Sequence, residues 1–141
     1  MQIRKWVCLA SLSFFILSAR ASELVVIVSA KNPTSVLSVA QVADIFLGQS
    51  GYFPGGQGAI AIDQKIGSSV RDEFYLKITG KSPALMKAYW SKMLFTGRGK
   101  PPKYVADGAA VRKLVAEDPA LVGYIEKTEL DSTVRLVLAV P

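Results

Sequence analysis

Residues 59–74 read AIAIDQKIGSSVRDEF, and this stretch decides the fold. It begins with an apolar run at 59–62, whose length is typical of a short buried strand. A turn around Gly67 follows, and a helix is predicted to continue from there to about residue 78. Ser69 and Asp72 fit a capping box at the start of that helix. Strand, turn and helix in this order are typical of α/β proteins.

The flanking sequence adds further elements on both sides. The run at 24–28 is wholly apolar and mostly β-branched, which is typical of a strand covered on both faces in a parallel sheet. Good N-caps predict three more helices, which begin after Ser38, Ser82 and Asp107. Two further strands are predicted at 121–125 and 134–140. This order predicts one α/β domain at 22–141, a small mixed sheet flanked by about four helices.

The helix predicted after Ser82 carries a broad apolar face. Spacings of three and four residues place its large side chains on one side of the helix. We expect this face to belong to the hydrophobic core. Its residues are Leu85, Met86, Tyr89, Trp90, Met93 and Leu94. The segment that follows, residues 96–102, is rich in Gly and Pro and is predicted to be a turn-rich link.

The first 21 residues have the pattern of a secretory signal peptide. Arg4 and Lys5 precede an apolar stretch at 6–17, which is too short to span a bilayer comfortably. Ala19-Arg20-Ala21 matches a cleavage site, so export to the periplasm and cleavage after Ala21 are predicted. The alternative is that the segment stays uncleaved as a membrane anchor.

Composition excludes several classes of function for the predicted mature chain. Removing residues 1–21 takes away three of the 17 basic residues and none of the 11 acidic ones, so the net charge falls from +6 to +3. This mild charge without a Lys/Arg run disfavours nucleic-acid binding. The chain has no histidine, and its single cysteine, Cys8, lies in the predicted leader. Histidine-dependent catalysis, thiol catalysis and disulfides are therefore excluded, and we expect neither an enzyme nor a cofactor.

The start of the helix after Gly67 is the best candidate binding site. Unpaired backbone N–H groups and the helix dipole favour a bound anion there, and the serine hydroxyls add donors. Cations lie nearby in the sequence, including one in the loop after the strand at 24–28, which would reach this edge if the strands are parallel. The candidate anion-binding residues are Lys31, Gln64, Lys65, Gly67, Ser68, Ser69, Val70 and Arg71.

Simpler interpretations of the same residues stay open. Ser68 or Ser69 can serve only as a helix cap, and the charges of Asp72 and Glu73 oppose a bound anion. Asp63, together with these two acidic residues, offers oxygen ligands for a hard cation, but no EF-hand spacing is present. Solvation or ion pairing is the more ordinary state of such carboxylates. The glycine-rich segment at 48–58 contains no phosphate-binding motif.

The chain resembles the phosphate-binding substrate-binding proteins of ABC transporters, and more closely the small single-lobe exported proteins related to them. Four segments carry the resemblance. They are LSVAQVADIFLG at 37–48, IDQKIGSSVRDEF at 62–74, AYWSKMLFTGRGKPP at 88–102 and LVGYI at 121–125. The resemblance implies one lobe of a type II periplasmic binding protein.

In the large members of that family, an Arg-Ser-Asp-Gly-Ser-Gly-Thr turn grips phosphate. Gly67 and Ser68 match its first glycine and the serine after it, whereas Gln64 and Ile66 stand at its arginine and aspartate positions. The charged clamp is therefore missing, and Arg71 is the candidate to replace it.

The resemblance implies weak oxyanion binding, with phosphate as the model ligand, in transport or sensing. A membrane transporter, a sensor or a second copy of the chain is the expected partner. The alternative is a ligand-free interaction module that keeps the fold, which an exposed patch around Tyr52, Phe53 and Tyr104 would favour.

Overall fold

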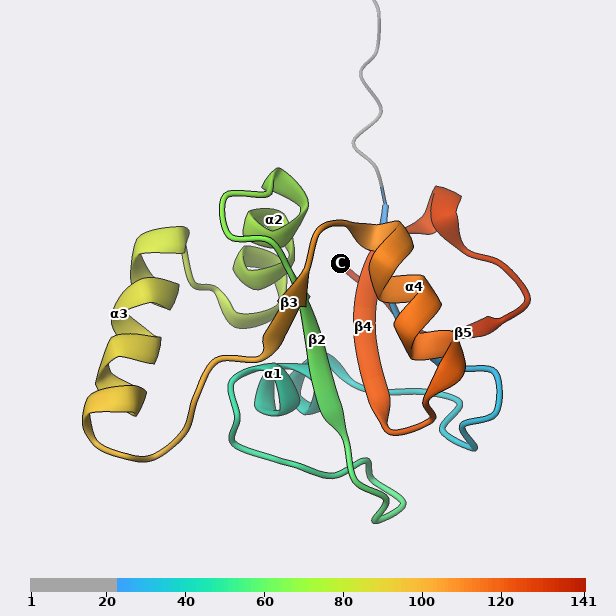
Figure 1. Cartoon of the computed structure of the whole chain (residues 1–141), viewed down its shortest axis with the longest axis horizontal. Helices are drawn as coiled ribbons and strands as arrows, with labels where there is room; N and C mark the ends of the chain where they lie inside the picture. Colours follow the sequence, from blue (N-terminus) through green and yellow to red (C-terminus); the bar gives the residue numbers. More distant parts are fainter. Residues whose placement is uncertain (1–22) are drawn as a thin grey trace, which may run out of the picture.

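The computed structural model describes residues 23–141, so the predicted leader at 1–21 lies outside the described residues (Figure 1). The α/β class, the mixed sheet and the four helices are confirmed within this range. In chain order the elements are β1 (Leu24–Ser29), α1 (Val39–Phe46), β2 (Ile60–Gln64), α2 (Ser69–Thr79), α3 (Pro83–Phe95), β3 (Lys103–Val105), α4 (Gly108–Glu117), β4 (Leu121–Glu126), the 3₁₀ turn η1 (Lys127–Glu129) and β5 (Val134–Ala139). The three-residue strand β3 was not predicted, because it is too short to show a pattern.

The five strands of residues 23–141 form one mixed sheet in the order β3-β2-β4-β1-β5. β2 runs parallel to β3 and β4, whereas β1 runs antiparallel to β4 and β5. The prediction that β1 belongs to a parallel sheet is therefore wrong. Burial on both faces makes β1 wholly apolar, and burial does not depend on strand direction. As a consequence, the loop after β1 and the turn after β2 lie at opposite ends of the sheet.

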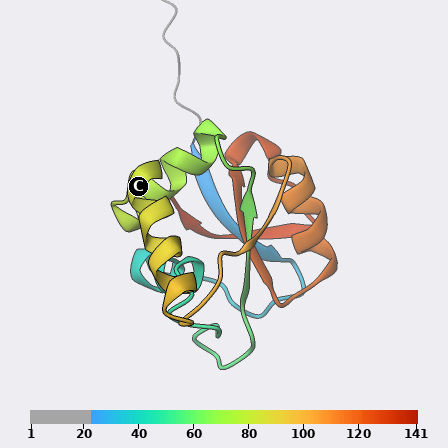
Figure 2. The ribbon, with the colours of Figure 1, turned by 60° about the vertical axis from the view of Figure 1, so that its left-hand side comes forward.

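β1 shows how both faces of the sheet are covered. Val26 and Val28 point into a core shared with α1, α2 and α3, while Val25 and Ile27 point into a second core formed with α4. Figure 2 shows α4 on one side of the sheet and the other helices on the opposite side. All buried residues of the two cores lie between residues 24 and 137. Residues 23–141 thus contain both cores of the fold.

Helix starts follow the predicted caps with one exception. Ser38 and Gln41 form the predicted capping box, with N–H···O distances of 3.1 and 2.9 Å, and Ser82 and Asp107 cap α3 and α4. α2 begins one residue earlier than expected. Its N-cap is Ser68, whose Oγ accepts a hydrogen bond from the backbone N–H of Arg71.

α3 is more exposed than its pattern predicted. Met86 and Trp90 are buried, and Tyr89 and Met93 pack partly against the core. Leu85 and Leu94, however, are more than half exposed, and Phe95 is 94% exposed. Only one side of the apolar face of α3 therefore belongs to the core.

Two absences hold for residues 23–141. None of their helices is both long and apolar enough to cross a membrane. They also contain no cluster of three or more His, Cys, Asp or Glu side chains that could hold a metal ion. The alternative of a cation site at Asp63, Asp72 and Glu73 is therefore not supported.

Candidate functional site

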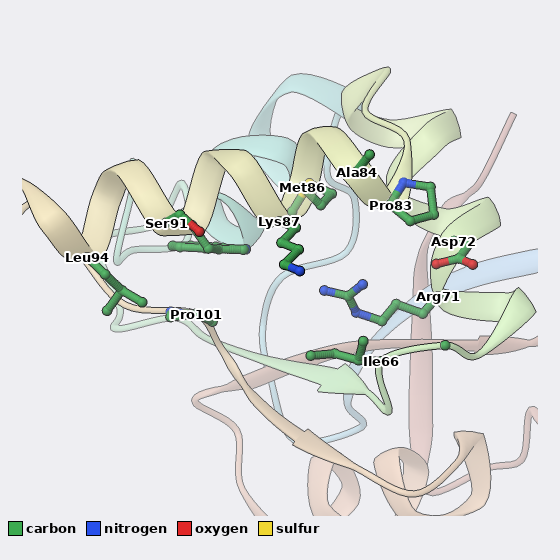
Figure 3. A pocket seen from close by; sticks show the side chains of 12 residues that line it. Ile66, Arg71, Asp72, Pro83, Ala84, Met86, Lys87, Ser91, Leu94 and Pro101 are labelled. Carbon is green, nitrogen blue, oxygen red and sulfur yellow. The ribbon is translucent and has the colours of Figure 1, made fainter.

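A cavity of about 550 Å³ lies between the turn after β2, the first part of α2, and α3 (Figure 3). The turn and α2 contribute Ile66, Gly67, Arg71 and Asp72 to its lining. Pro101 closes one end. The other wall is α3, which contributes Pro83, Ala84, Met86, Lys87, Trp90, Ser91 and Leu94. Ile66 and Leu94 are more than half exposed, so the cavity is open to solvent on their side.

Behind the cavity, the carboxylate of Asp63 is the centre of a buried polar network. Asp63 is the fourth residue of β2 and is 3% exposed. Its Oδ2 accepts hydrogen bonds from Arg71 Nε at 3.2 Å and the Tyr75 hydroxyl at 2.7 Å. Its Oδ1 accepts from the Tyr124 hydroxyl at 2.5 Å and the backbone N–H of Gln64 at 2.7 Å. Four donors, one of which is the cation Arg71, thus compensate the burial of this carboxylate.

The two tyrosines of this network are permanent donors at ordinary pH. Burial, and after it the negative charge of Asp63, raises the pKa of Tyr75 and of Tyr124 far above the ordinary value of 10.0. The hydroxyls therefore stay protonated and keep donating to the carboxylate. Asp63 is in turn fixed in the position from which it holds Arg71.

The side chain of Arg71 links the network to the cavity. The residue is 8% exposed, and its Cζ lies 4.8 Å from the centroid of the Tyr75 ring. Nε binds Asp63, while the two terminal nitrogens make no hydrogen bond within residues 23–141. In Figure 3 the guanidinium points into the cavity, toward the ammonium group of Lys87. Arg71 is thus a held cation with free donors on its cavity side.

The α3 wall brings a second cation and an unused donor. Lys87 is exposed and forms no ion pair within the described part of the chain. Trp90 is 6% exposed, and its indole N–H is buried without a hydrogen-bond partner among residues 23–141. A buried donor without a partner is uncommon in a folded protein, because water is lost and nothing replaces it.

The turn before α2 also keeps free backbone donors. Gly67 has φ 91°, a left-handed conformation that glycine adopts without strain. The N–H groups of Gly67, Ser69 and Val70 have no backbone acceptor within residues 23–141. Such unpaired N–H groups at a helix start favour an anion. Of these three residues, only Gly67 lines the cavity.

The predicted site residues divide into four groups. Gly67 and Arg71 line the cavity, and Ser68, Ser69 and Val70 form the adjoining helix start without lining it. Lys65 lies in the same turn but lines a different cavity of about 350 Å³, beside β3.

The remaining two predicted residues are not available at this place. Gln64 is 3% exposed and its amide nitrogen donates to the Tyr124 carbonyl at 2.8 Å, so its side chain belongs to the core. Lys31 follows β1, and because β1 is antiparallel to β4, it lies at the opposite end of the sheet. The expectation that Lys31 joins the site is therefore wrong.

Sequence reasoning missed Lys87 and Trp90, and also the partners of Arg71. Both α3 residues lie in a segment whose apolar spacing was assigned to the core. The signal for the network was Asp63 itself, a charged residue at the end of an apolar strand, since such a position demands buried partners.

Comparison with solved structures identifies the fold. A putative phosphate ABC transporter substrate-binding protein from Clostridium perfringens, solved with bound phosphate, matches with a TM-score of 0.67 and 19% identity over 82% of this chain. An ABC-type phosphate transport receptor from Vibrio cholerae matches with a TM-score of 0.65 and 19% identity over 82%. PstS from Borrelia burgdorferi matches with a TM-score of 0.57 and 14% identity over 82%.

These matches cover 44%, 45% and 46% of the respective structures, so the chain spans less than half of each. No protein-family model matches the chain, and no curated protein matches its sequence. At these identities the comparison concerns the fold. The chain has a periplasmic-binding-protein-like fold.

Proposed function

We propose that this chain is an exported, periplasmic solute-binding protein that binds a small oxyanion, such as inorganic phosphate, in transport or sensing. The anion binds beside the turn at 67–71. The observation that carries the proposal is Arg71, a buried guanidinium that is held by Asp63 and presents its free nitrogens to the cavity beside Gly67. The fold shared with phosphate-binding proteins supports it.

Arg71 suits this role because its position is set before a ligand arrives. The Nε–Asp63 bond and the contact with the Tyr75 ring fix the guanidinium. Less conformational freedom is therefore lost when an anion binds. A planar guanidinium with two free ends also matches the geometry of an oxyanion better than a lysine does.

The expected affinity is low, because the site is open on one side. Three or four charge-assisted hydrogen bonds contribute roughly 1.5–3 kcal/mol each. Association costs on the order of 4–15 kcal/mol. The dissociation constant is therefore expected to be on the order of 1 mM. Tight binding would need a second surface, which a membrane transporter, a sensor protein or a second copy of this chain would supply.

An amide NMR titration tests the proposal. Residues 22–141, which contain both cores, are titrated with phosphate and with sulfate at low salt. Saturable shifts centred on residues 67–71, larger with phosphate, are expected. No localised shift at about 50 mM of either anion, well above the expected dissociation constant, would refute the proposal.

Arg71→Lys keeps the charge but loses the two-ended geometry, and is expected to weaken anion binding about tenfold. Arg98→Lys is the matched control, because Arg98 is exposed and does not line the cavity. Near-UV circular dichroism checks that both variants keep their tertiary packing. Equal affinities of the two variants for the anion would contradict the assignment of Arg71 to the binding site.

A second candidate function, an interaction module without a ligand, rests on Phe95. Phe95 is 94% exposed at the end of α3 and follows Leu94, which is 56% exposed, and neighbouring exposed apolar side chains are a feature of interaction surfaces. The patch around Tyr52, Phe53 and Tyr104 that would favour this alternative is incomplete, since Phe53 is 2% exposed although the two tyrosines are more than half exposed. Sedimentation equilibrium tests this candidate with a second copy of the chain as the partner. Self-association that is lost in Phe95→Ser supports it, and a protein that stays monomeric at high concentration contradicts it.

A further inference from the structure

The cavity between α2 and α3 is larger and more apolar than a bare oxyanion requires. Its volume, about 550 Å³, lies within the roughly 300–1,000 Å³ typical of pockets for organic ligands. Most of its lining side chains are apolar, and they include Ile66, Met86, Trp90 and Leu94. An inorganic phosphate held at Arg71 would leave these surfaces in contact with water.

The charged groups of the cavity lie together at one part of it. Arg71 from α2 and Lys87 from α3 point toward one another in Figure 3. Within residues 23–141 no carboxylate bridges the two cations. Asp63 lies behind Arg71, and Lys87 forms no ion pair. Two facing cations repel each other, and an anion between them removes that repulsion.

We propose that this cavity binds an organic anion, with an oxyanion head group between Arg71 and Lys87 and an apolar, preferably aromatic, body against Trp90 and Leu94. This inference rests on the proposed function, because it uses the same Arg71, and it defines the class of solute. The buried polar group that points to a ligand is Arg71, which is nine-tenths buried and has free nitrogens in the cavity.

The position of the Trp90 ring supports the same assignment. Trp90 lines the cavity, and its N–H lacks an acceptor among residues 23–141. That N–H is itself buried, so what Trp90 offers to a ligand in the cavity is its ring. The ring itself offers a flat surface for an aromatic body.

Asp72 limits how much negative charge the cavity accepts. It lines the cavity on the α2 side and has no ion-pair partner within the described residues. Its carboxylate repels an anionic head group. Asp72→Asn is therefore expected to tighten binding of the anion severalfold, the opposite of what loss of a cation does.

Three probes separate this inference from the proposed function. Phenyl phosphate, inorganic phosphate and benzyl alcohol are titrated into residues 22–141, with the indole N–H signal of Trp90 and the amide signals as readouts. Trp90 is the only tryptophan in this range. Phenyl phosphate is expected to bind at least tenfold more tightly than inorganic phosphate and to shift the Trp90 signal, and benzyl alcohol is expected to bind more weakly than phenyl phosphate.

Each other outcome has a distinct meaning. Equal affinity for phenyl phosphate and inorganic phosphate overturns this inference and leaves the proposed function standing. Equal affinity for phenyl phosphate and benzyl alcohol overturns the head-group contact. No binding of either phosphate compound overturns both proposals. Binding of phenyl phosphate alone supports this inference and overturns inorganic phosphate as the solute.

Two pairs of variants assign the contacts on α3. Leu94→Ser is expected to weaken the binding of phenyl phosphate about fivefold and to leave the binding of inorganic phosphate unchanged. Phe95 is the next residue but does not line the cavity, so Phe95→Ser is expected to change neither affinity. Lys87→Gln is expected to weaken the binding of both anions. Lys92 lies on the same helix but does not line the cavity, so Lys92→Gln is expected to weaken the binding of neither. All four residues are exposed, so the fold is expected to tolerate the changes. Equal effects within either pair contradict the assignment.

Discussion

At the scale of single residues, Asp63 determines the arrangement of the candidate site. It is a buried carboxylate whose compensation comes from one cation, Arg71, and two tyrosine hydroxyls. The same bond that stabilises Asp63 also orients Arg71 toward the cavity. Stability and binding therefore depend on the same pair of side chains, and substitutions separate them only in part.

Asp63→Asn keeps the size of the side chain but removes its charge. Arg71 is then left nearly buried without its anionic partner, which is expected to destabilise the fold by about 3–5 kcal/mol. Urea unfolding followed by circular dichroism measures this loss. Asp44→Asn is the control, because Asp44 is exposed and its side chain forms no hydrogen bond within residues 23–141, and its effect is expected to stay within about 0.5 kcal/mol. Similar losses in both variants would contradict the account of the network.

The raised pKa values of the two buried tyrosines predict that the folded protein loses stability in alkali. The pKa values of Tyr75 and Tyr124 are raised in the folded state, so the unfolded chain releases these protons first, near the ordinary value of 10.0. Their contribution is complete below pH 10 and falls as the pH rises above it, by about 1.4 kcal/mol per pH unit for each tyrosine. Urea unfolding at pH 9 to 11 measures the slope. Tyr75→Phe is expected to show a shallower slope, and an unchanged slope would contradict the assignment.

At the scale of elements, the start of α2 has two tasks that can be separated. Ser68 caps the helix, and the free N–H groups after it are available to an anion. α3 begins with the same kind of cap, Ser82, which accepts from the backbone N–H of Leu85. The two serines therefore form a matched pair. Neither lines the cavity, but Ser68 lies in the turn between Gly67 and Arg71, where the anion is proposed to bind.

Ser68→Ala and Ser82→Ala are both expected to lower the free energy of unfolding by about 1 kcal/mol, because each removes one N-cap. Only Ser68→Ala is expected to weaken anion binding as well. Thermal melting and the NMR titration with phosphate measure the two effects. If Ser68→Ala loses stability but keeps its affinity, Ser68 is a cap and not part of the site.

At the scale of the whole molecule, local signals predicted most elements but not their relative placement. Apolar runs and caps located β1, α1, α3 and α4 well, because strand burial and helix capping are decided within a few residues. The direction of β1 depends on which strands it pairs with, far away in the chain. For the same reason the sequence placed Lys31 at the wrong end and could not show that Arg71 meets Asp63. The cavity wall formed by α3 depends on helix packing, which apolar spacing alone does not reveal.

The pairing of β1 with β5 has a consequence for how this chain can be cut and rejoined. Val25 lies opposite Ala139, and the N–H of Val140 donates to the carbonyl of Leu24 at 2.9 Å, so the two ends of the described domain are neighbours. A short linker from residue 141 to residue 23, with new ends between the exposed Gly55 and Gly56, is expected to give a circular permutant with the same sheet. Its far-UV spectrum and cooperative melting would test this. Such a result would show that the order of the strands in space, rather than the place where the chain starts, specifies the fold.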